Sequence, residues 1–249
     1  MHERFAQLAG EHISYDRTLA PLDGFSEILA KLAGEGLKGA NVTVPFKEDA
    51  FHWVHELSHR AHQAGAVNTL IKTADGHWLG DNTDGVGLVA DLCRLGFDPR
   101  DKTLLVLGAG GATRGILGPI LDRGPKSITV ANRTPAKALS LADVFGIEAA
   151  EFEQLHGRRF DIVINATSAS LSGQLPALPS DVIASTGLAY DLAYGPRGTT
   201  FTRWAASQGC PKTADGLGML VAQGAESYYL WRGVRPDWQK VLGEMEAQR

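Results

Sequence analysis

The stretch Thr103-Leu104-Leu105-Val106-Leu107-Gly108-Ala109-Gly110-Gly111-Ala112-Thr113 decides the fold. A run of residues typical of a buried strand leads into a glycine-rich turn, and a helix with apolar periodicity follows. Gly108 permits the tight turn, and Gly110 lets backbone N–H groups approach a pyrophosphate at the positive end of the helix. Thr113 stands where the pattern usually has a third glycine, which weakens the argument for close helix–strand packing. The stretch predicts a loop that binds a dinucleotide.

The chain around this stretch alternates between strands and helices. We expect further strands at 127–131, 161–165 and 187–191 and helices at 135–145 and 199–208, the pattern of a doubly wound parallel sheet. We therefore predict an α/β fold. A Rossmann-type nucleotide-binding domain is expected at 84–216, and a smaller α/β substrate domain, closed by C-terminal helices, at 1–83 and 217–249.

The smaller domain has its own expected elements. The apolar pattern predicts strands at 13–19, 41–44, 66–72 and 77–80, with the last two forming a hairpin. Helices are expected at 22–32 and 45–57, with two closing helices at 217–231 and 236–247, and a further helix at 84–95 begins the nucleotide-binding domain.

The composition argues against several classes of protein. The 249 residues include 24 Lys and Arg against 28 Asp and Glu, a formal net charge of −4, whereas nucleic acids and anionic membranes favour basic partners. Cys93 and Cys210 form no CxxC pair, which argues against a disulfide framework or a zinc knuckle. Because no apolar run is long enough to span a bilayer, we expect a cytoplasmic protein with reduced thiols.

The end of the second strand of the nucleotide domain indicates which cofactor is bound. Folds that prefer NAD place an acidic residue there to bind the ribose hydroxyls, whereas this chain has Asn132-Arg133-Thr134 with Lys137 one turn on. An arginine fork matches a phosphate, and a carboxylate would repel one. The sequence therefore predicts NADP(H) rather than NAD(H).

Two ionisable residues are candidates for chemistry. Lys47 ends the segment Gly39-Ala40-Asn41-Val42-Thr43-Val44-Pro45-Phe46-Lys47, in which Pro45 ends a strand and suits the first turn of a helix. Asp84 begins a helix after the loop 81–83. Taken singly, Lys47 is a solvated lysine at a rim and Asp84 is a helix cap.

The order of motifs changes that interpretation. The chain contains, in sequence, Asn41-Val42-Thr43-Val44-Pro45-Phe46-Lys47, Gly65-Ala66-Val67-Asn68-Thr69, Gly80-Asp81-Asn82-Thr83-Asp84-Gly85, Gly108-Ala109-Gly110-Gly111-Ala112, Asn132-Arg133-Thr134 and Ala214-Asp215-Gly216-Leu217-Gly218-Met219-Leu220-Val221-Ala222-Gln223. This set closely resembles the shikimate dehydrogenase family, from about Phe5 to the C-terminus. The resemblance implies reversible, NADPH-dependent reduction of 3-dehydroshikimate to shikimate, a step of chorismate and aromatic amino acid biosynthesis.

The resemblance also implies roles for individual residues. Lys47 would be the catalytic acid/base and Asp84 its partner, since an ammonium can stabilise a developing alkoxide and donate the proton. Substrate contacts are implied for Asn41, Thr43, Lys47, Asn68, Asp84, Tyr194 and Gln223. Cofactor contacts are implied for Gly108, Ala109, Gly110, Gly111, Ala112, Asn132, Arg133, Thr134, Lys137, Leu192, Gly216 and Met219. We expect no metal, no nucleic acid or membrane partner, and a monomer or homodimer.

The chain departs from the family pattern at several points. Lys137 stands where many members have arginine, and Leu192 where methionine is common. Members also begin with a strand and a Ser-x-Ser loop that binds the substrate carboxylate, whereas this sequence begins within the following helix. We expect that the start of the reading frame was assigned too late and that the natural protein is longer. The alternative is a truncated protein of low activity.

Other interpretations stay open at this point. A paralogue that acts on quinate would share these motifs, and a non-catalytic NADPH-binding protein would keep the nucleotide domain. His52, His55, His59 and His62 recur at helical spacing, but Ser58 breaks the helix between them, so a solvated polar face is favoured over a metal site.

Overall fold

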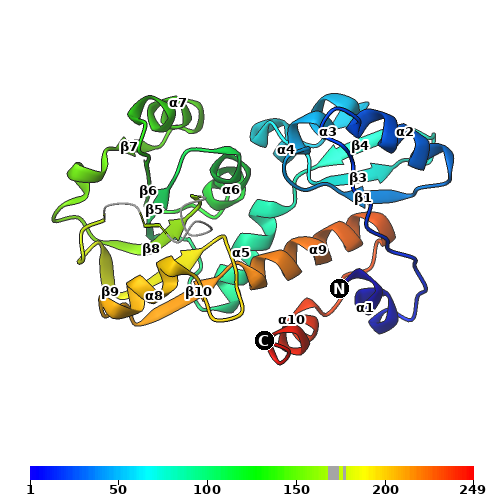
Figure 1. The fold of residues 1–249 in the computed structure, drawn as a ribbon. Coiled ribbons are helices and arrows are strands. Elements are labelled where there is room, and N and C mark those ends of the chain that lie inside the picture. Colours follow the sequence, from blue (N-terminus) through cyan, green and yellow to red (C-terminus); the bar gives the residue numbers. More distant parts are fainter. Residues whose placement is uncertain (168–173, 176–177) are drawn as a thin grey trace.

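The computed structural model describes residues 1–167, 174–175 and 178–249. Figure 1 shows two lobes, each built on its own sheet, with helices α5 (Asp84–Arg94) and α9 (Leu217–Arg232) running between them. Helices α1 (His2–Leu8) and α10 (Trp238–Glu246) pack against α9. Among the described residues, no helix combines the length and the apolar character that crossing a membrane requires.

The larger lobe is a six-stranded sheet in which every pairing is parallel, in the order β10-β9-β8-β5-β6-β7. Along β5, Leu104 and Val106 face a core that includes α5, α6 and α7, while Leu105 and Leu107 face a core that includes α8. The predicted doubly wound sheet is confirmed. Its elements are β5 (Thr103–Leu107), α6 (Gly111–Leu121), β6 (Ser127–Ala131), α7 (Pro135–Phe145), β7 (Glu148–Ala150), the 3₁₀ turn η1 (Phe152–Leu155), β8 (Phe160–Asn165), β9 (Ile183–Asp191), α8 (Thr200–Ser207) and β10 (Lys212–Asp215).

The smaller lobe is a four-stranded mixed sheet in the order β1-β3-β4-β2. The predicted hairpin is present, because β3 pairs antiparallel with β4 and also with β1, while β2 runs parallel to β4. Leu29, Leu70 and Trp78 belong to its core. The elements are α2 (Phe25–Gly34), β1 (Gly39–Asn41), α3 (Lys47–Trp53), β2 (Glu56–Leu57), α4 (His59–Ala64), β3 (Thr69–Lys72) and β4 (Trp78–Asp81).

The strand expected at 13–19 is wrong. The segment is extended but pairs with no sheet, and Leu19 at its end is 94% exposed. Side chains hold it instead, since the Tyr15 ring stacks on His2 and the Tyr15 hydroxyl donates to Asn41 Oδ1 at 2.8 Å. An alternating pattern cannot distinguish a strand in a sheet from an extended segment anchored in this way.

Two further boundaries near Lys47 also differ from expectation. Strand β1 ends at Asn41, and Val44, expected within it, is 78% exposed. The helix expected to reach residue 57 ends at Trp53, because His55 and Ser58 donate their backbone N–H groups to Trp78 and Gly80 of β4, at 2.9 Å each. Tertiary pairing therefore overrides the helical pattern there.

Gly87 of α5 sets how closely α9 can approach. A Cβ at this position would lie 2.6 Å from the backbone nitrogen of Gln223 and 2.8 Å from the carbonyl oxygen of Met219. Because these are backbone atoms, a side chain would push the two helices apart.

We expect Gly87→Ala to lower the free energy of unfolding by about 1–3 kcal/mol, as overpacking of a core does. Urea denaturation followed by circular dichroism measures this change. Gly243→Ala is the matched control, since a Cβ at this helical glycine of α10 meets nothing within 4 Å. Equal stability of the two variants would contradict the argument.

Candidate active site

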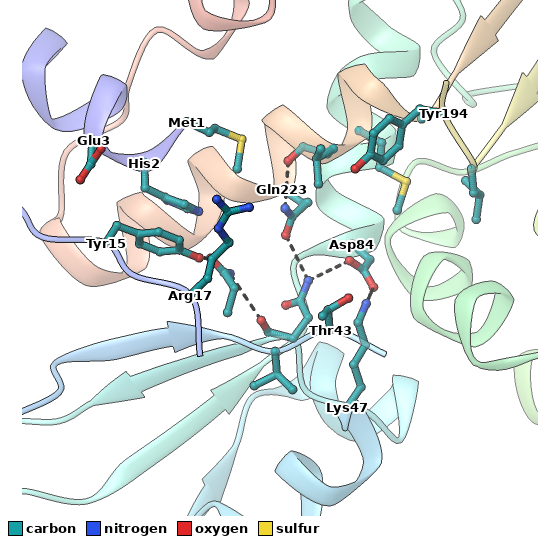
Figure 2. Close-up of a pocket in the computed structure, with 17 residues that line it drawn as sticks. Met1, His2, Glu3, Tyr15, Arg17, Thr43, Lys47, Asp84, Tyr194 and Gln223 are labelled. Atoms are coloured by element: carbon teal, nitrogen blue, oxygen red, sulfur yellow. Dashed lines mark hydrogen bonds and ion pairs between the residues drawn. The ribbon is translucent and has the colours of Figure 1, made fainter. Parts of the chain in front are cut away.

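A cavity of about 490 Å³ opens between the two lobes (Figure 2). It draws residues from the N-terminal segment, from β1 and the loop after it, from the starts of α3 and α5, and from α9. The residues lining it are Met1, His2, Glu3, Tyr15, Arg17, Asn41, Val42, Thr43, Lys47, Asn68, Asp84, Leu192, Tyr194, Gly216, Met219, Leu220 and Gln223. Every residue for which the sequence implied a substrate contact is among them.

Lys47 and Asp84 meet in this cavity. The Lys47 Nζ donates to Asp84 Oδ2 at 2.5 Å, and both side chains are partly exposed to the cavity. Each is the first residue of its helix, and the Lys47 backbone carbonyl accepts from the Val67 N–H at 2.8 Å. The ammonium is therefore fixed on two sides, and the pair can hold and transfer a proton at one point of the lining.

Asn68 fixes the other carboxylate oxygen. Its Nδ2 donates to Asp84 Oδ1 at 2.8 Å, and its Oδ1 accepts from the Thr83 backbone N–H at 2.9 Å. Asn82 closes the same loop, since its Oδ1 accepts from the Asp84 N–H at 3.1 Å and its Nδ2 donates to the Ala66 carbonyl at 3.0 Å. Asp84 is thus oriented by the β3–β4 hairpin as well as by its own helix.

The remaining substrate candidates differ in how free their polar atoms are. Asn41 donates to Ser227 Oγ at 2.9 Å and accepts from Tyr15, and Gln223 donates to the Leu220 carbonyl at 2.9 Å. The hydroxyls of Thr43 and Tyr194 make no hydrogen bond within the described chain. Thr43 and Tyr194 can therefore bind a ligand directly, whereas Asn41 already serves the framework of the site.

The glycine turn has the geometry of a phosphate cradle. Gly108 has φ +101°, and a Cβ there would lie 3.0 Å from Thr167 Cγ2. Gly110 caps α6, and a Cβ built on Gly110 or Gly111 would meet none of the described residues within 4 Å, so there is room for an anion beside the N-terminus of this helix. Thr113, the departure from the pattern, donates its hydroxyl to the Gly108 carbonyl at 2.7 Å and so holds the turn.

The predicted 2′-phosphate contacts lie beside this turn. Strands β5 and β6 pair in register up to Leu107 and Ala131, and the Gly108 N–H donates to the Ala131 carbonyl at 2.7 Å. The following residues, Asn132 to Thr134, therefore adjoin the turn. Arg133 and Lys137 are exposed and make no ion pair among the residues described, so both charges are available to an anion. The residues present fit NADP(H).

Three of the other cofactor candidates line the same cavity as Lys47 and Asp84. Leu192 follows β9, Gly216 precedes α9, and Met219 lies in its first turn. A Cβ on Gly216 would lie 2.1 Å from the Leu192 carbonyl oxygen, so only glycine allows this approach. The Met219 N–H donates to the buried Tyr190 hydroxyl at 3.3 Å, and that hydroxyl donates to Asp91 Oδ2 at 2.7 Å. Tyr190 thereby fixes the start of α9 relative to α5.

The N-terminal segment forms a wall of the cavity that the sequence did not predict. His2, Tyr15 and Arg17 line the cavity, and Figure 2 shows Arg17 reaching over it. Burial, together with the nearby N-terminal charge, lowers the pKa of His2 to about 4. No motif marks these residues, since only the tertiary path of the segment brings them to the site. In contrast, the described residues contain no cluster of three or more His, Cys, Asp or Glu side chains placed to hold a metal.

Known proteins resemble this chain over nearly its whole length. Three family models match: the shikimate dehydrogenase substrate binding domain at residues 1–70, shikimate / quinate 5-dehydrogenase at 92–173, and the shikimate 5'-dehydrogenase C-terminal domain at 216–246. A shikimate dehydrogenase (NADP(+)) from Hahella chejuensis is 52% identical over 247 residues, which cover 97% of this chain and 91% of the relative.

Solved structures agree with the sequence relatives. An Ael1 enzyme from Pseudomonas putida superimposes with a TM-score of 0.92 at 45% identity, covering 98% of this chain and 91% of that one. Shikimate 5-dehydrogenase from Thermus thermophilus, in complex with NADP(H) and shikimate, gives a TM-score of 0.87 at 33% identity, covering 99% and 92%. The chain therefore belongs to the shikimate dehydrogenase family.

Proposed function

We propose that this protein catalyses the reversible, NADP-dependent interconversion of shikimate and 3-dehydroshikimate. The observation that carries the proposal is the Lys47–Asp84 pair, joined at 2.5 Å in a cavity that Leu192, Gly216 and Met219 also line. Acid/base groups and cofactor-side residues thus share one space. The relative from Hahella chejuensis carries the same activity in its name, which supports the assignment.

The residues of the chain have defined tasks in this reaction. When bound, NADP⁺ supplies a nicotinamide that accepts a hydride from C3 of shikimate. In its neutral amine form Lys47 takes the proton of the C3 hydroxyl as C3 becomes a carbonyl, and in the reverse direction the resulting ammonium returns that proton to the oxygen. Asp84 balances the ammonium charge and orients it, while Asn68 holds Asp84 in place. Thr43 and Tyr194 offer hydroxyls to the remaining substrate groups.

The cofactor tasks fall to the larger lobe. The N-terminus of α6 would hold the pyrophosphate, and Arg133 with Lys137 would bind the 2′-phosphate. The closing helices and residues 1–83 would form the substrate domain, with 84–216 as the nucleotide domain. We propose a monomer or homodimer, because one chain supplies every residue that these tasks use. The free thiols of Cys93 and Cys210 support a place in the cytoplasm.

The decisive experiment measures shikimate-dependent reduction of NADP⁺ through the absorbance of the reduced nicotinamide. We expect turnover with shikimate to exceed turnover with quinate. Faster turnover of quinate would assign the protein to the paralogue, and NADPH binding without turnover of either acid would make it a non-catalytic binder.

Arg133→Gln tests the cofactor assignment separately. We expect kcat/KM for NADP⁺ to fall about 10-fold or more, because a charge-assisted contact to the 2′-phosphate is lost. The value for NAD⁺ should stay nearly constant, since NAD⁺ lacks that phosphate. Arg100→Gln, at an exposed arginine outside the cavity, is the control. An equal loss with both cofactors would remove Arg133 from phosphate recognition.

A further inference from the structure

Helix α9 forms part of the cavity wall but has no N-cap side chain of its own. Gly216 occupies the N-cap position, and a Cβ there would lie 2.1 Å from the Leu192 carbonyl oxygen, so no larger residue fits. The side chain of an N-cap residue normally accepts a hydrogen bond from an N–H of the first helical turn. Gly216 and Met219 both line the cavity. The turn that forms this wall therefore needs an acceptor from another part of the chain.

Tyr190, the penultimate residue of β9, supplies that acceptor. Its hydroxyl accepts from the N–H of Met219, the third residue of α9, at 3.3 Å and donates to Asp91 Oδ2 on α5 at 2.7 Å. Tyr190 and Asp91 are fully buried, and Arg94 Nε donates to the other oxygen of Asp91 at 2.7 Å. Burial, together with the adjacent Asp91 carboxylate, raises the pKa of the Tyr190 hydroxyl well above its usual value, so the hydroxyl keeps its proton and donates it to Asp91.

The Asp91 carboxylate holds the same turn from a second direction. A Cβ on Gly218 would lie 2.2 Å from each oxygen of Asp91, so the backbone of α9 lies directly against this carboxylate. Neither Tyr190 nor Asp91 belongs to the described lining of the cavity. The two side chains therefore support the wall from behind and fix where its backbone lies.

We propose that Tyr190 is a positioning residue for hydride transfer, an inference that rests on the proposed function. Lys47 lies on the smaller lobe at the C3 hydroxyl, whereas Gly216 and Met219 bound the side of the cavity on which the nicotinamide would lie. Hydride transfer requires reacting atoms about 3–3.5 Å apart, and a misplacement of about 1 Å can cost about 100-fold in rate. By capping α9, Tyr190 sets the distance between this wall and Lys47. It acts through Met219 and touches neither ligand.

The test replaces Tyr190 by phenylalanine, which keeps the ring and removes the capping oxygen. We expect the rate of hydride transfer in a single turnover to fall about 10-fold, because the start of α9 loses its fixed position. Stopped-flow absorbance of the reduced nicotinamide measures this rate. KM for shikimate should change less than about 2-fold, since Lys47 and Asp84 are held by other contacts.

An isotope effect identifies the affected step. With shikimate deuterated at C3, kcat of Tyr190→Phe should show the full primary isotope effect, because the slowed hydride step then limits turnover. A fall in kcat without an isotope effect would place the defect in another step and would overturn the proposal. A loss confined to KM would overturn it as well.

Tyr228→Phe is the matched control. Tyr228 lies on the same helix, is fully buried and donates its hydroxyl to the carboxylate of Glu11, outside the described cavity lining. Tyr228→Phe therefore loses the same atom and the same kind of bond, but it should keep the hydride-transfer rate within about 2-fold. Equal rate losses in Tyr190→Phe and Tyr228→Phe would mean that any loosened tyrosine slows the enzyme.

A second variant tests the partner of the hydroxyl. Asp91→Ala releases the Tyr190 hydroxyl and should also slow hydride transfer. The double variant should be less than about 2-fold slower than Tyr190→Phe alone, because groups in one network are not additive. Multiplied losses would show that the two residues act separately. If Tyr190→Phe does not fold, Asp91→Ala carries the same rate and isotope comparisons.

Hydrogen exchange tests the cap without any turnover. Peptides that cover residues 216–222 should exchange about 10-fold faster in Tyr190→Phe than in the unaltered chain, and at the unaltered rate in Tyr228→Phe. Mass spectrometry measures this exchange, and equal exchange in Tyr190→Phe and the unaltered chain would contradict the cap.

The failure of the proposed function is distinguishable from the failure of this inference. If the unaltered chain does not oxidise shikimate, the proposed function fails and the positioning role fails with it, while the exchange comparison still decides whether Tyr190 caps α9. If Tyr190→Phe oxidises shikimate as fast as the unaltered chain, only the role of Tyr190 is wrong.

Discussion

Replacement of Lys47 by alanine is expected to lower kcat for shikimate oxidation by about 10²- to 10⁴-fold, the range for loss of a positioned acid/base group. The reason is geometric, since the ammonium is held at 2.5 Å from Asp84 and opens on the same cavity as Met219. Affinity for NADP⁺ should change less than about 2-fold, because the glycine turn and Arg133 lie on the other lobe. Steady-state assays at saturating shikimate measure kcat. Fluorescence titration with NADP⁺ measures the affinity for the cofactor.

Two further variants make this result specific. Asp84→Asn should also lower kcat, and the double variant should lose little more than Lys47→Ala alone, because two groups that act as a unit are not additive. Lys31→Ala, at an exposed lysine of α2 outside the cavity, is the control and should keep full turnover. Turnover at the unaltered level in Lys47→Ala would remove Lys47 from the mechanism.

Replacement of Arg60 by methionine is expected to lower the free energy of unfolding at pH 7 by about 3 kcal/mol, the lower end of the range for breaking a buried ion pair. Arg60 donates to both carboxylate oxygens of Asp81, at 2.9 and 2.8 Å, and to Glu226 Oε1 at 3.2 Å. Both carboxylates are buried and keep other partners, Ser58 for Asp81 and Arg235 for Glu226, which moderates the loss. Urea denaturation at pH 7 measures the change.

The pH dependence of this change has a defined sign. Burial alone would raise the pKa of Asp81, but hydrogen bonds from Arg60 and Ser58 outweigh it and hold that pKa below its usual value. The stabilisation is therefore present above the unfolded pKa of about 3.9 and is lost as the pH falls through the folded value. The difference between Arg60→Met and the unaltered chain should shrink below about pH 4.

A matched variant separates burial from charge. Arg158→Met breaks the more exposed ion pair with Glu148 and should cost less than about 1 kcal/mol. If Arg60→Met and Arg158→Met lowered the free energy of unfolding equally, the buried network beneath the loop that leads to Asp84 would be contradicted. The same holds if the effect of Arg60→Met did not change with pH.

Local sequence patterns predicted the structure correctly where interactions between residues close in sequence determine it. The strand, turn and helix at 103–121 follow from apolar runs and from glycines whose backbone freedom the turn needs, and the predicted parallel sheet formed around them. Local sequence patterns gave wrong predictions where a residue distant in the sequence determines the local structure. Residues 13–19 alternate like a strand but are anchored by side chains, and residues 54–57 leave the helix to pair with β4.

The sequence by itself determined the fold class, because alternating strand and helix patterns depend on residue type and on spacing along the chain. It predicted Lys47 and Asp84 as the reacting pair only through the resemblance of its motifs to the family. Only the tertiary structure decided that Lys47 and Asp84, 37 residues apart, touch. The β3–β4 hairpin places them together through the bonds of Val67 and Asn68. Only the tertiary structure brought Arg17 to the cavity as well, since the path of an extended segment is set by what it packs against and not by its own periodicity.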